Sequence, residues 1–261
     1  LHTEEIIKTV SSEVSKYNFP LVVDPVMIAK SGAPLLKPEA MNALESFLLP
    51  KATVVTPNRF EAEKLADMEI KDLEDAKIAA RKISEMGPKA VVIKGGHLNG
   101  EEAVDLLYHN GEFKTFSAPR LNTKTTHGTG CSFSAAIAAE LAKKSDIEKA
   151  VEKAKKVVTL GIRFGLKVGK GYGPVNPMAY LYRESSKYNV LTNLEEAKAL
   201  VEATPEVAML VPEVGMNIAM ATPYAESVAD VAAIEGRIVK TSEGAKAVGN
   251  PKFGCSSHLA R

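Results

Sequence analysis

The sequence contains no tryptophan, no glutamine and only two cysteines among its 261 residues. Glutamine is missing while glutamate and lysine are abundant, which is the direction expected of a heat-adapted protein. Cys131 and Cys255 lie far apart, and neither has a second Cys or His at the spacing of a metal site. This cysteine usage fits a reducing cytoplasm and excludes a disulfide framework or a zinc ribbon.

The chain also lacks an excess of either charge and lacks long apolar runs. Lys and Arg number 33 and Asp and Glu 32, so the net charge of +1 offers nucleic acid no broad basic surface. The apolar runs fall far short of the roughly 18 residues of a membrane-spanning helix, and no secretory signal opens the chain. The composition, 45% hydrophobic and 25% charged, is that of one large or two smaller globular domains, not of a disordered or collagenous protein.

Buried strands alternate with amphipathic helices in the first part of the chain. The expected strands are short runs rich in β-branched residues, and the helices between them place apolar residues at helical spacing. This alternation predicts an α/β fold with a parallel sheet covered on both faces, and it places functional groups at the carboxyl ends of the strands. The expected strands are residues 20–27, 52–56 and 89–94, and the expected helices are 3–16 with Thr3 as N-cap, one from Pro38, 58–66 and 72–86.

Turn and capping signals organise the rest of the chain. Asn110 and Gly111 separate two runs of strand character, which predicts a β-hairpin over residues 103–117. A separate α/β unit is expected to begin near residue 184. Two capping boxes, in which a hydroxyl side chain precedes a glutamate by three residues, predict the starts of two further helices. These boxes are Ser145 with Glu148 and Thr192 with Glu195.

The densest group of glycine and hydroxyl residues runs from 125 to 132, directly before a helix of small residues. Gly128, Thr129 and Gly130 let the backbone turn its amides inward, and the free N–H groups of a helix start form an anion site. Cys131 sits where the helix start would stabilise a thiolate. The alternative interpretation is a glycine-rich cap followed by a buried cysteine. We favour a functional site, because four polar or glycine residues in succession give a plain cap no benefit.

Three further candidate residues come just after expected strands. Asn58 and Glu61 lie one helical turn apart on one face, where an amide and a carboxylate can hold Mg²⁺ and water over phosphates. Lys94 ends a strand before two glycines, where its ammonium can reach a phosphate. Each signal is weak alone, since Asn and Glu are common in the first turn of a helix and most lysines at strand ends are solvated.

Five motifs follow one another along the chain, namely DPVMIAKSG (24–32), TPNRFEAEKL (56–65), VVIKGGH (91–97), THGTGCSFSAAIAAELA (126–142) and GKGYGPVNP (169–177). They resemble the motifs of the phosphomethylpyrimidine kinases of thiamine biosynthesis, which are ribokinase-like enzymes. The resemblance implies a three-layer α/β/α fold with a mostly parallel sheet. It also implies ATP and Mg²⁺ as cofactors, and phosphorylation of hydroxymethylpyrimidine and then of its monophosphate.

The same resemblance implies roles for individual residues. Cys131 would be the catalytic base, and the glycine-rich segment that ends there would form an anion hole. Asn58 and Glu61 would organise Mg²⁺ and phosphate. Lys94 would contact the ATP phosphates, with Asp24 beside them. These roles agree with the needs of phosphoryl transfer, which depends mainly on positioning and on neutralising the charge of the transferred group.

Two stretches near the end of the chain, GMNIAMATPYAESVADVAAIEGRIVK (215–240) and NPKFGCSSHLAR (250–261), resemble the start of an archaeal-type thiamine-phosphate synthase domain. This resemblance implies that Arg237 and His258 are a functional pair. A guanidinium and an imidazole suit the pyrophosphate leaving group of such a reaction.

Together the resemblances predict a thiamine-pathway enzyme with a kinase domain over residues 1–183 and the first part of a synthase domain over 184–261. The synthase would join the pyrimidine pyrophosphate to thiazole phosphate. We expect more of each family's sequence before residue 1 and after residue 261. The expected partners are these small molecules and a second copy of the chain, with no nucleic acid and no membrane. Two alternatives stay open: another ribokinase-like vitamin kinase, such as one for pyridoxal, and a second domain that only senses thiamine phosphate.

Overall fold

The computed structural model describes residues 1–27, 35–95 and 101–255. The chain forms two compact units, Leu1–Pro177 and Met178–Arg261. The buried apolar residues of the first unit form two clusters, and those of the second unit form two others. Since each unit has its own core, each is described by itself.

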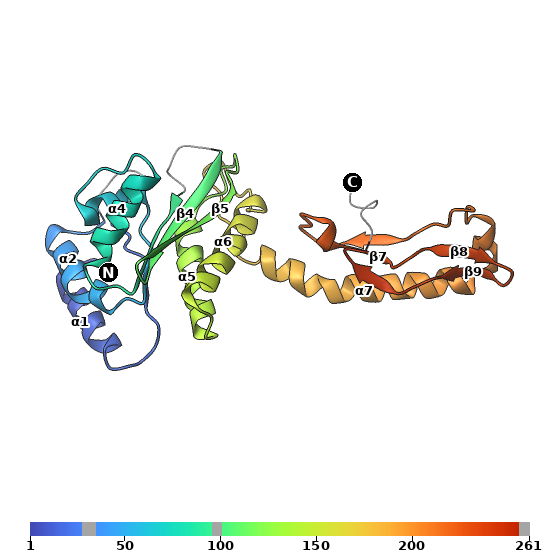
Figure 1. Ribbon diagram of the computed structural model, residues 1–261, viewed down its shortest axis with the longest axis horizontal. Coiled ribbons are helices and arrows are strands. Elements are labelled where there is room, and N and C mark those ends of the chain that lie inside the picture. The colour runs from blue at the N-terminus through green and yellow to red at the C-terminus, as the bar shows by residue number, and fades with distance from the viewer. Residues whose placement is uncertain (28–34, 96–100, 256–261) are drawn as a thin grey trace. The chain divides into compact units, whose positions relative to one another are not determined.

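A five-stranded mixed sheet forms the centre of the first unit (Figure 1). In pairing order its strands are β1 (Val22–Val23), β2 (Val54–Val55), β3 (Ala90–Ile93), β4 (Glu102–His109) and β5 (Glu112–Pro119). β1, β2 and β3 are parallel, as predicted, while β4 and β5 run antiparallel to their neighbours at one edge. The predicted hairpin is confirmed, and both residues of its turn, Asn110 and Gly111, have positive φ.

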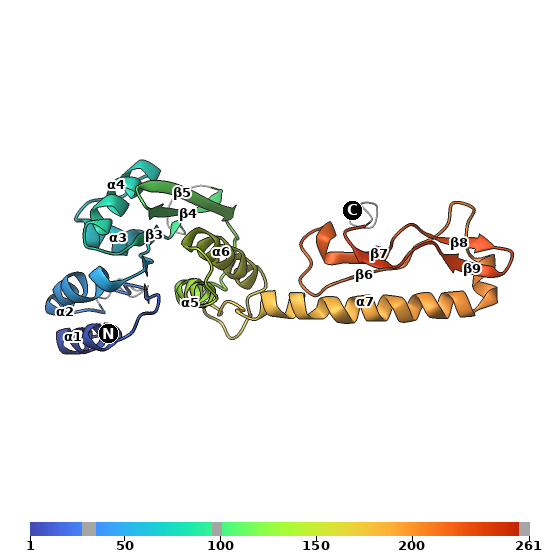
Figure 2. The ribbon, with the colours of Figure 1, turned by 60° about the horizontal axis from the view of Figure 1, so that its bottom comes forward.

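Helices cover both faces of this sheet, which gives three layers (Figures 1 and 2). One face carries α1 (Glu4–Val14), α2 (Pro38–Ala43), α3 (Arg59–Ala66) and α4 (Leu73–Ser84). The other carries α5 (Thr129–Ala142) and α6 (Ile147–Arg163). The π-helix η1 (Leu44–Leu48) and the 3₁₀ helix η2 (Leu49–Lys51) continue α2. The predicted α/β fold with covered sheet faces is confirmed.

Successive strand residues point to opposite faces, so each central strand contributes to both cores. Val55 of β2 and Val91 of β3 pack in the cluster with α1–α4. Val54 and Val92, their neighbours in the chain, pack in the cluster with α5 and α6. All four side chains are completely buried. This burial on both faces explains why these strands read as uninterrupted apolar runs.

The start of α6 differs from the prediction, and the capping box of Ser145 and Glu148 is wrong. Asp146 is the N-cap, and its Oδ1 accepts the backbone N–H of Lys149 at 2.8 Å. The Ser145 hydroxyl instead donates to Glu140 at 3.3 Å. Aspartate and serine are comparable N-cap residues, and the Asp146 carboxylate also interacts favourably with the helix dipole. At α1 the expected cap is confirmed, since the side chain of Thr3 accepts the N–H of Ile6.

The described residues of the second unit form one long helix, two 3₁₀ helices and two small antiparallel sheets. The helices are α7 (Ala179–Ala203), η4 (Pro205–Met209) and η5 (Val228–Asp230). One sheet pairs β10 (Pro251–Phe253), β7 (Val231–Ile234) and β6 (Ala219–Ala221) in that order. The other pairs β8 (Ile238–Thr241) with β9 (Gly244–Ala247).

The predicted capping box of Thr192 and Glu195 is also wrong, because α7 passes through both residues without a break. The Thr192 hydroxyl donates to the carbonyl of Tyr188 at 3.0 Å, which is a common arrangement for a threonine inside a helix. Val190 and Leu194 of α7 pack against the small sheet and are buried. This packing stabilises a continuous helix where the local signal indicated a new start.

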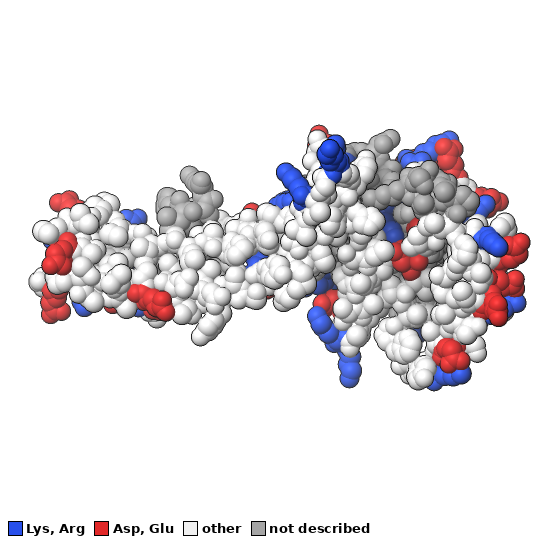
Figure 3. Space-filling model, turned by 180° about the vertical axis from the view of Figure 1, so that it is seen from behind, with Lys and Arg blue, Asp and Glu red and all other residues white. Residues whose placement is uncertain are grey.

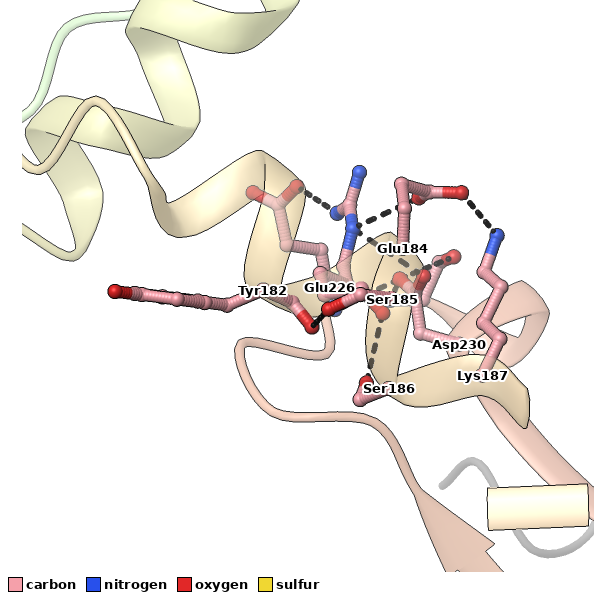
Figure 4. Close-up of polar contacts among 9 residues, drawn as sticks. Tyr182, Glu184, Ser185, Ser186, Lys187, Glu226 and Asp230 are labelled. Carbon is pink, nitrogen blue, oxygen red and sulfur yellow. Dashed lines mark hydrogen bonds and ion pairs between the residues drawn. The ribbon is translucent and has the colours of Figure 1, made fainter. Parts of the chain in front are cut away.

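A charged cluster fastens the first turns of α7 to the segment before β7 (Figure 4). The guanidinium of Arg183 lies 2.9 Å from Glu226, and its Nε lies 3.5 Å from Glu184 and 3.7 Å from Asp230. Asp230 in turn accepts the backbone N–H groups of Glu226 and Ser227. These contacts are internal to the second unit and account for the burial of an arginine there.

Charged side chains of both signs are interspersed on the face shown in Figure 3, and neither sign forms a continuous patch there. This distribution agrees with the nearly balanced net charge of +1. Among the helices of the described residues, none is long and apolar enough to cross a membrane.

Candidate active site

Three charged side chains meet at the carboxyl edge of the parallel strands. Asp24 follows β1 and Lys94 follows β3, and Nζ of Lys94 lies 2.7 Å from Oδ1 of Asp24. Glu61, in the first turn of α3, places its Oε2 4.0 Å from the same Nζ. Parallel strands deliver their last residues to one edge, which brings together residues that are far apart in the sequence. The structure thus assembles three of the predicted site residues.

The glycine-rich segment brings the start of α5 to this cluster. Gly128 is the N-cap of α5 and has a φ of +81°, a conformation that glycine adopts without strain. A Cβ added to Gly130 would lie 3.4 Å from Nζ of Lys94 and 3.6 Å from Oδ2 of Asp24. These are ordinary van der Waals distances, so the ion pair of Lys94 and Asp24 lies directly in front of the start of α5.

The start of α5 is suited to bind an anion beside Lys94. Gly130 and Cys131 are the second and third residues of the helix, so no carbonyl within the helix accepts their N–H groups. Their N–H groups and the helix dipole favour a negative charge in front of the helix, and Lys94 adds a full positive charge beside it. Thr129, the first residue, donates its hydroxyl to the carbonyl of Thr126 at 2.8 Å, which braces the loop. Cys131 is exposed, so the alternative of a buried, packed cysteine is wrong.

Asn58 and Glu61 form a reciprocal capping box at the start of α3. The backbone N–H of Asn58 donates to Oε2 of Glu61 at 2.6 Å, and the N–H of Glu61 donates to Oδ1 of Asn58 at 3.0 Å. Burial raises the pKa of the Glu61 carboxyl above its ordinary value, an effect that the nearby Lys94 ammonium partly offsets. The box fixes the carboxylate at the edge of the site, where it faces the Lys94 ammonium.

The same two residues fit a magnesium ion that keeps most of its water. The Asn58 amide oxygen accepts the N–H of Glu61, and the Glu61 carboxylate accepts backbone N–H groups of Asn58 and Met27, which leaves lone pairs on these oxygens for a ligand water. Mg²⁺ usually keeps several waters and takes its other ligands from one or two carboxylates and the substrate phosphates. Within the described residues there is no group of three His, Cys, Asp or Glu that could enclose an ion. The donor set therefore suits a metal that arrives with phosphate, not a closed protein site.

The raised pKa of Glu61 predicts a pH dependence of stability. The folded protein holds a proton on this carboxyl to higher pH than the unfolded chain does, so its stabilising contribution is present below the unfolded pKa near 4.5 and is lost as the pH rises through the folded pKa. Glutamine cannot ionise. We therefore expect the free energy of unfolding of Glu61→Gln, measured relative to that of wild type, to be larger at pH 7 than at pH 4. Urea unfolding at both pH values measures this difference, and an equal difference at both would contradict it.

Two buried hydroxyl groups in this site were not predicted. Thr56, which follows β2, lies 3.2 Å through Oγ1 from both Oδ1 of Asp24 and Oγ of Ser134. A sequence signal for Thr56 exists, because Val-Val-Asp-Pro at 22–25 recurs as Val-Val-Thr-Pro at 54–57. In the pairing of β1 with β2, Val23 lies opposite Val55, so the next residues, Asp24 and Thr56, become neighbours. Ser134, one turn inside α5, had no comparable signal.

The predicted pair in the second unit is described only in part. Arg237 lies between β7 and β8, is exposed, and donates through its guanidinium to the carbonyl of Val214. Its own carbonyl accepts the N–H of Val248 at 2.8 Å. His258 lies outside the described residues, as do residues 28–32 of the first motif and 96–97 of the third. The pairing of Arg237 with His258 therefore stays a prediction.

The sequence of the first unit matches that of a known protein family. The sequence profile described as phosphomethylpyrimidine kinase matches residues 1–176. The chain belongs to the phosphomethylpyrimidine kinase family. A second profile, described as thiamine-phosphate synthase ThiN, matches residues 193–261, so the kinase segment is followed by a ThiN segment. The resemblances seen in the sequence are thereby confirmed for both parts of the chain.

Relatives named as kinases and solved structures agree with this family. The hydroxymethylpyrimidine/phosphomethylpyrimidine kinase of Haemophilus influenzae is 45% identical over 185 residues, which cover 69% of this chain and 69% of that protein. The thiamine biosynthesis bifunctional protein ThiED of Geobacter sulfurreducens is 41% identical, over 67% of this chain and 36% of its own length. The chain thus spans about a third of the bifunctional relative and about two thirds of the kinases.

The fold is also that of solved ribokinase-like enzymes. The pyridoxal kinase of Staphylococcus aureus in complex with ADP superposes with a TM-score of 0.65 at 40% identity, over 68% of this chain and 65% of that one. The phosphomethylpyrimidine kinase of Clostridium difficile gives 0.54 at 41% identity, over 61% of this chain and 64% of that one. Both structures are therefore similar to this chain in sequence as well as in fold.

Proposed function

We propose that this protein transfers the terminal phosphoryl group of ATP to hydroxymethylpyrimidine and then to its monophosphate. The observation that carries the proposal is the meeting of Lys94, Asp24 and the start of α5 at Gly130. A phosphate at the start of α5 would meet an ammonium and two helix N–H groups. Phosphoryl transfer requires this combination of positioning and positive charge.

The residues of this site have separate roles in the proposed phosphoryl transfer. Lys94 and the N–H groups of Gly130 and Cys131 neutralise charge on the transferred group, and they need little rearrangement because the sheet and helix already hold them. Asn58 and Glu61 orient water and phosphate through the capping box. Mg²⁺, when bound with ATP, would supply further positive charge to the phosphates. Asp24 holds the Lys94 ammonium through an ion pair at 2.7 Å.

Cys131 is the residue that we propose as the base. It is exposed at the third position of α5, next to the N–H groups that would bind the transferred phosphoryl group. A base there can accept the proton of the substrate hydroxyl as the new O–P bond forms.

The nucleotide part of the proposal is tested by binding. We expect ADP with Mg²⁺ to bind the wild-type chain, and Lys94→Ala to weaken that binding by about 1.5 to 3 kcal/mol, the value of a hydrogen bond to a charged group. Titration calorimetry measures both. The matched control is Lys89→Ala, an exposed lysine before the opposite end of β3, which should bind like wild type. No binding by a folded wild-type chain would overturn the proposal.

A second substrate is favoured by the solved structures, several of which are pyridoxal kinases. The pyridoxal kinase of S. aureus, solved with AMP-PCP and pyridoxal, is 39% identical and covers 68% of this chain. The residues described above bind phosphate and do not distinguish the two acceptors. Turnover with hydroxymethylpyrimidine and with pyridoxal, each at saturating ATP, separates them: the pyrimidine should have the larger kcat/KM, and the reverse order would assign the chain to pyridoxal.

We further propose that the ThiN segment joins the pyrimidine pyrophosphate to thiazole phosphate, with Arg237 and His258 acting on the pyrophosphate leaving group. The support is the profile match over residues 193–261 together with the kinase that would make its substrate in the same chain. Formation of thiamine phosphate and pyrophosphate in a protein that carries the complete ThiN domain tests this. Binding of thiamine phosphate without turnover would instead assign a sensor. Association into a homo-oligomer is part of the same proposal, and sedimentation equilibrium tests it.

A further inference from the structure

The Thr56 hydroxyl lies at the centre of the site and is completely buried. It is within hydrogen-bond distance of three acceptors: Oδ1 of Asp24 and Oγ of Ser134, each at 3.2 Å, and the carbonyl of Val23 at 3.5 Å. Ser134 is also buried, and its hydroxyl donates to the carbonyl of Gly130 at 2.9 Å. The two hydroxyls therefore connect the ends of β1 and β2 with the first turn of α5.

The number of hydroxyl protons decides which group donates a hydrogen bond to which. Thr56 has one hydroxyl proton, and a carboxylate is a stronger acceptor than a hydroxyl or a carbonyl. The Thr56 proton therefore goes to Asp24 when that carboxyl is ionised. Ser134 also has one proton, so at any moment it donates either to Thr56 or to the carbonyl of Gly130. Both hydroxyl protons are used within this buried group.

The consequence is a fixed orientation of the Asp24 carboxylate. Oδ1 accepts both the Lys94 ammonium and the Thr56 hydroxyl, which occupies it with two donors. Oδ2 is turned toward α5, 3.6 Å from the position that a Cβ on Gly130 would take. Without the hydroxyl, the carboxylate would be held by Lys94 alone and could rotate about its Cβ–Cγ bond.

We propose that Thr56 and Ser134 are positioning residues for phosphoryl transfer, which orient Asp24 and hold the start of α5 at a fixed distance from Lys94. In this proposal neither hydroxyl contacts the phosphate. The inference rests on the proposed kinase function and adds to it two residues that act through Asp24 and Gly130. Its physical basis is that groups misplaced by a fraction of an ångström still bind a substrate but stabilise the transition state less well.

The test compares Thr56→Val, which removes only the hydroxyl, with Thr56→Ser, which keeps it. We expect Thr56→Val to lower kcat about tenfold while the KM for ATP changes less than about threefold, since the loss falls mainly on the transition state. Thr56→Ser should restore kcat to within about threefold of wild type. A merely structural role would lower thermal stability without this split between kcat and KM. A Thr56→Val enzyme with wild-type kcat, or a Thr56→Ser enzyme as impaired as the valine variant, would overturn the proposal.

Ser134→Ala provides a second route if the valine variant folds poorly. It should lower kcat in the same direction, and the effects of Thr56→Val and Ser134→Ala should be less than additive in the double variant, because the two hydroxyls contact each other in one buried group. Fully additive effects would overturn the joint role of the two hydroxyls. The matched control is Ser11→Ala, another buried serine bonded to a backbone carbonyl, on α1, which should leave kcat unchanged.

ADP binding by calorimetry keeps the two hypotheses apart. A wild type that neither binds ADP nor turns over rejects the proposed function, and this inference with it. An active wild type with a fully active Thr56→Val variant rejects only the role of the hydroxyls.

Discussion

Replacing Cys131 by alanine should lower kcat for phosphorylation about 10²- to 10⁴-fold, the usual contribution of a general base. The KM for ATP should stay close to that of wild type, because Lys94 and the N–H groups at the start of α5 are unchanged. Cys131 is exposed at the third position of that helix. Steady-state kinetics over a range of ATP concentrations measure both quantities.

Two variants make this prediction specific to the thiolate. Cys131→Ser keeps the size of the side chain but offers a hydroxyl that does not ionise near neutral pH, so it should be nearly as slow as the alanine variant. Cys255→Ala removes the other cysteine, which lies in the second unit near the carbonyl of Ala233, and should leave kcat unchanged. A Cys131→Ala enzyme that keeps more than a tenth of wild-type kcat would contradict the assignment of the base.

The edge of the sheet that carries the site could be predicted from the sequence, because its signals are local. Apolar runs that end in Asp24, Thr56 and Lys94 mark three strand ends, and alternation with helices makes the strands parallel. Because parallel strands end at the same edge of the sheet, these three residues lie close together. The helix start at α5 was predicted for a similar reason, since Gly128 takes a positive φ that glycine adopts without strain, before any tertiary contact is considered.

The orientation of individual side chains could not be predicted in this way. The hydroxyl of Ser134 matters because α5 packs beneath β2, and this contact joins residues that are far apart in the chain. The first capping box failed because two neighbouring residues, Ser145 and Asp146, could both cap α6, and local preference did not decide between them. The second failed because packing of Val190 and Leu194 keeps α7 continuous through Thr192.

The position of Lys94 depends on a second buried group that the sequence did not indicate. Asp105 of β4 accepts the N–H of Gly95, the residue after Lys94, at 2.8 Å. Its other oxygen lies 3.0 Å from Nζ of Lys155 on α6, which also donates to the carbonyl of Ala103 at 2.7 Å. Both charged side chains are about nine-tenths buried. The ion pair therefore anchors the end of β3 to the layer of helices behind it.

Replacing Lys155 by methionine should destabilise the protein by about 3 to 5 kcal/mol, because it leaves the buried Asp105 carboxylate without a counter-charge. Adding Asp105→Asn should recover most of that loss, since asparagine is neutral and still accepts the N–H of Gly95. Lys156→Met is the matched control: that neighbour forms an exposed pair with Glu152 and should change stability by less than about 1 kcal/mol. Guanidinium unfolding followed by circular dichroism measures all three, as the chain has no tryptophan to report by fluorescence. A Lys155→Met protein as stable as Lys156→Met would show that the buried pair does not support the fold.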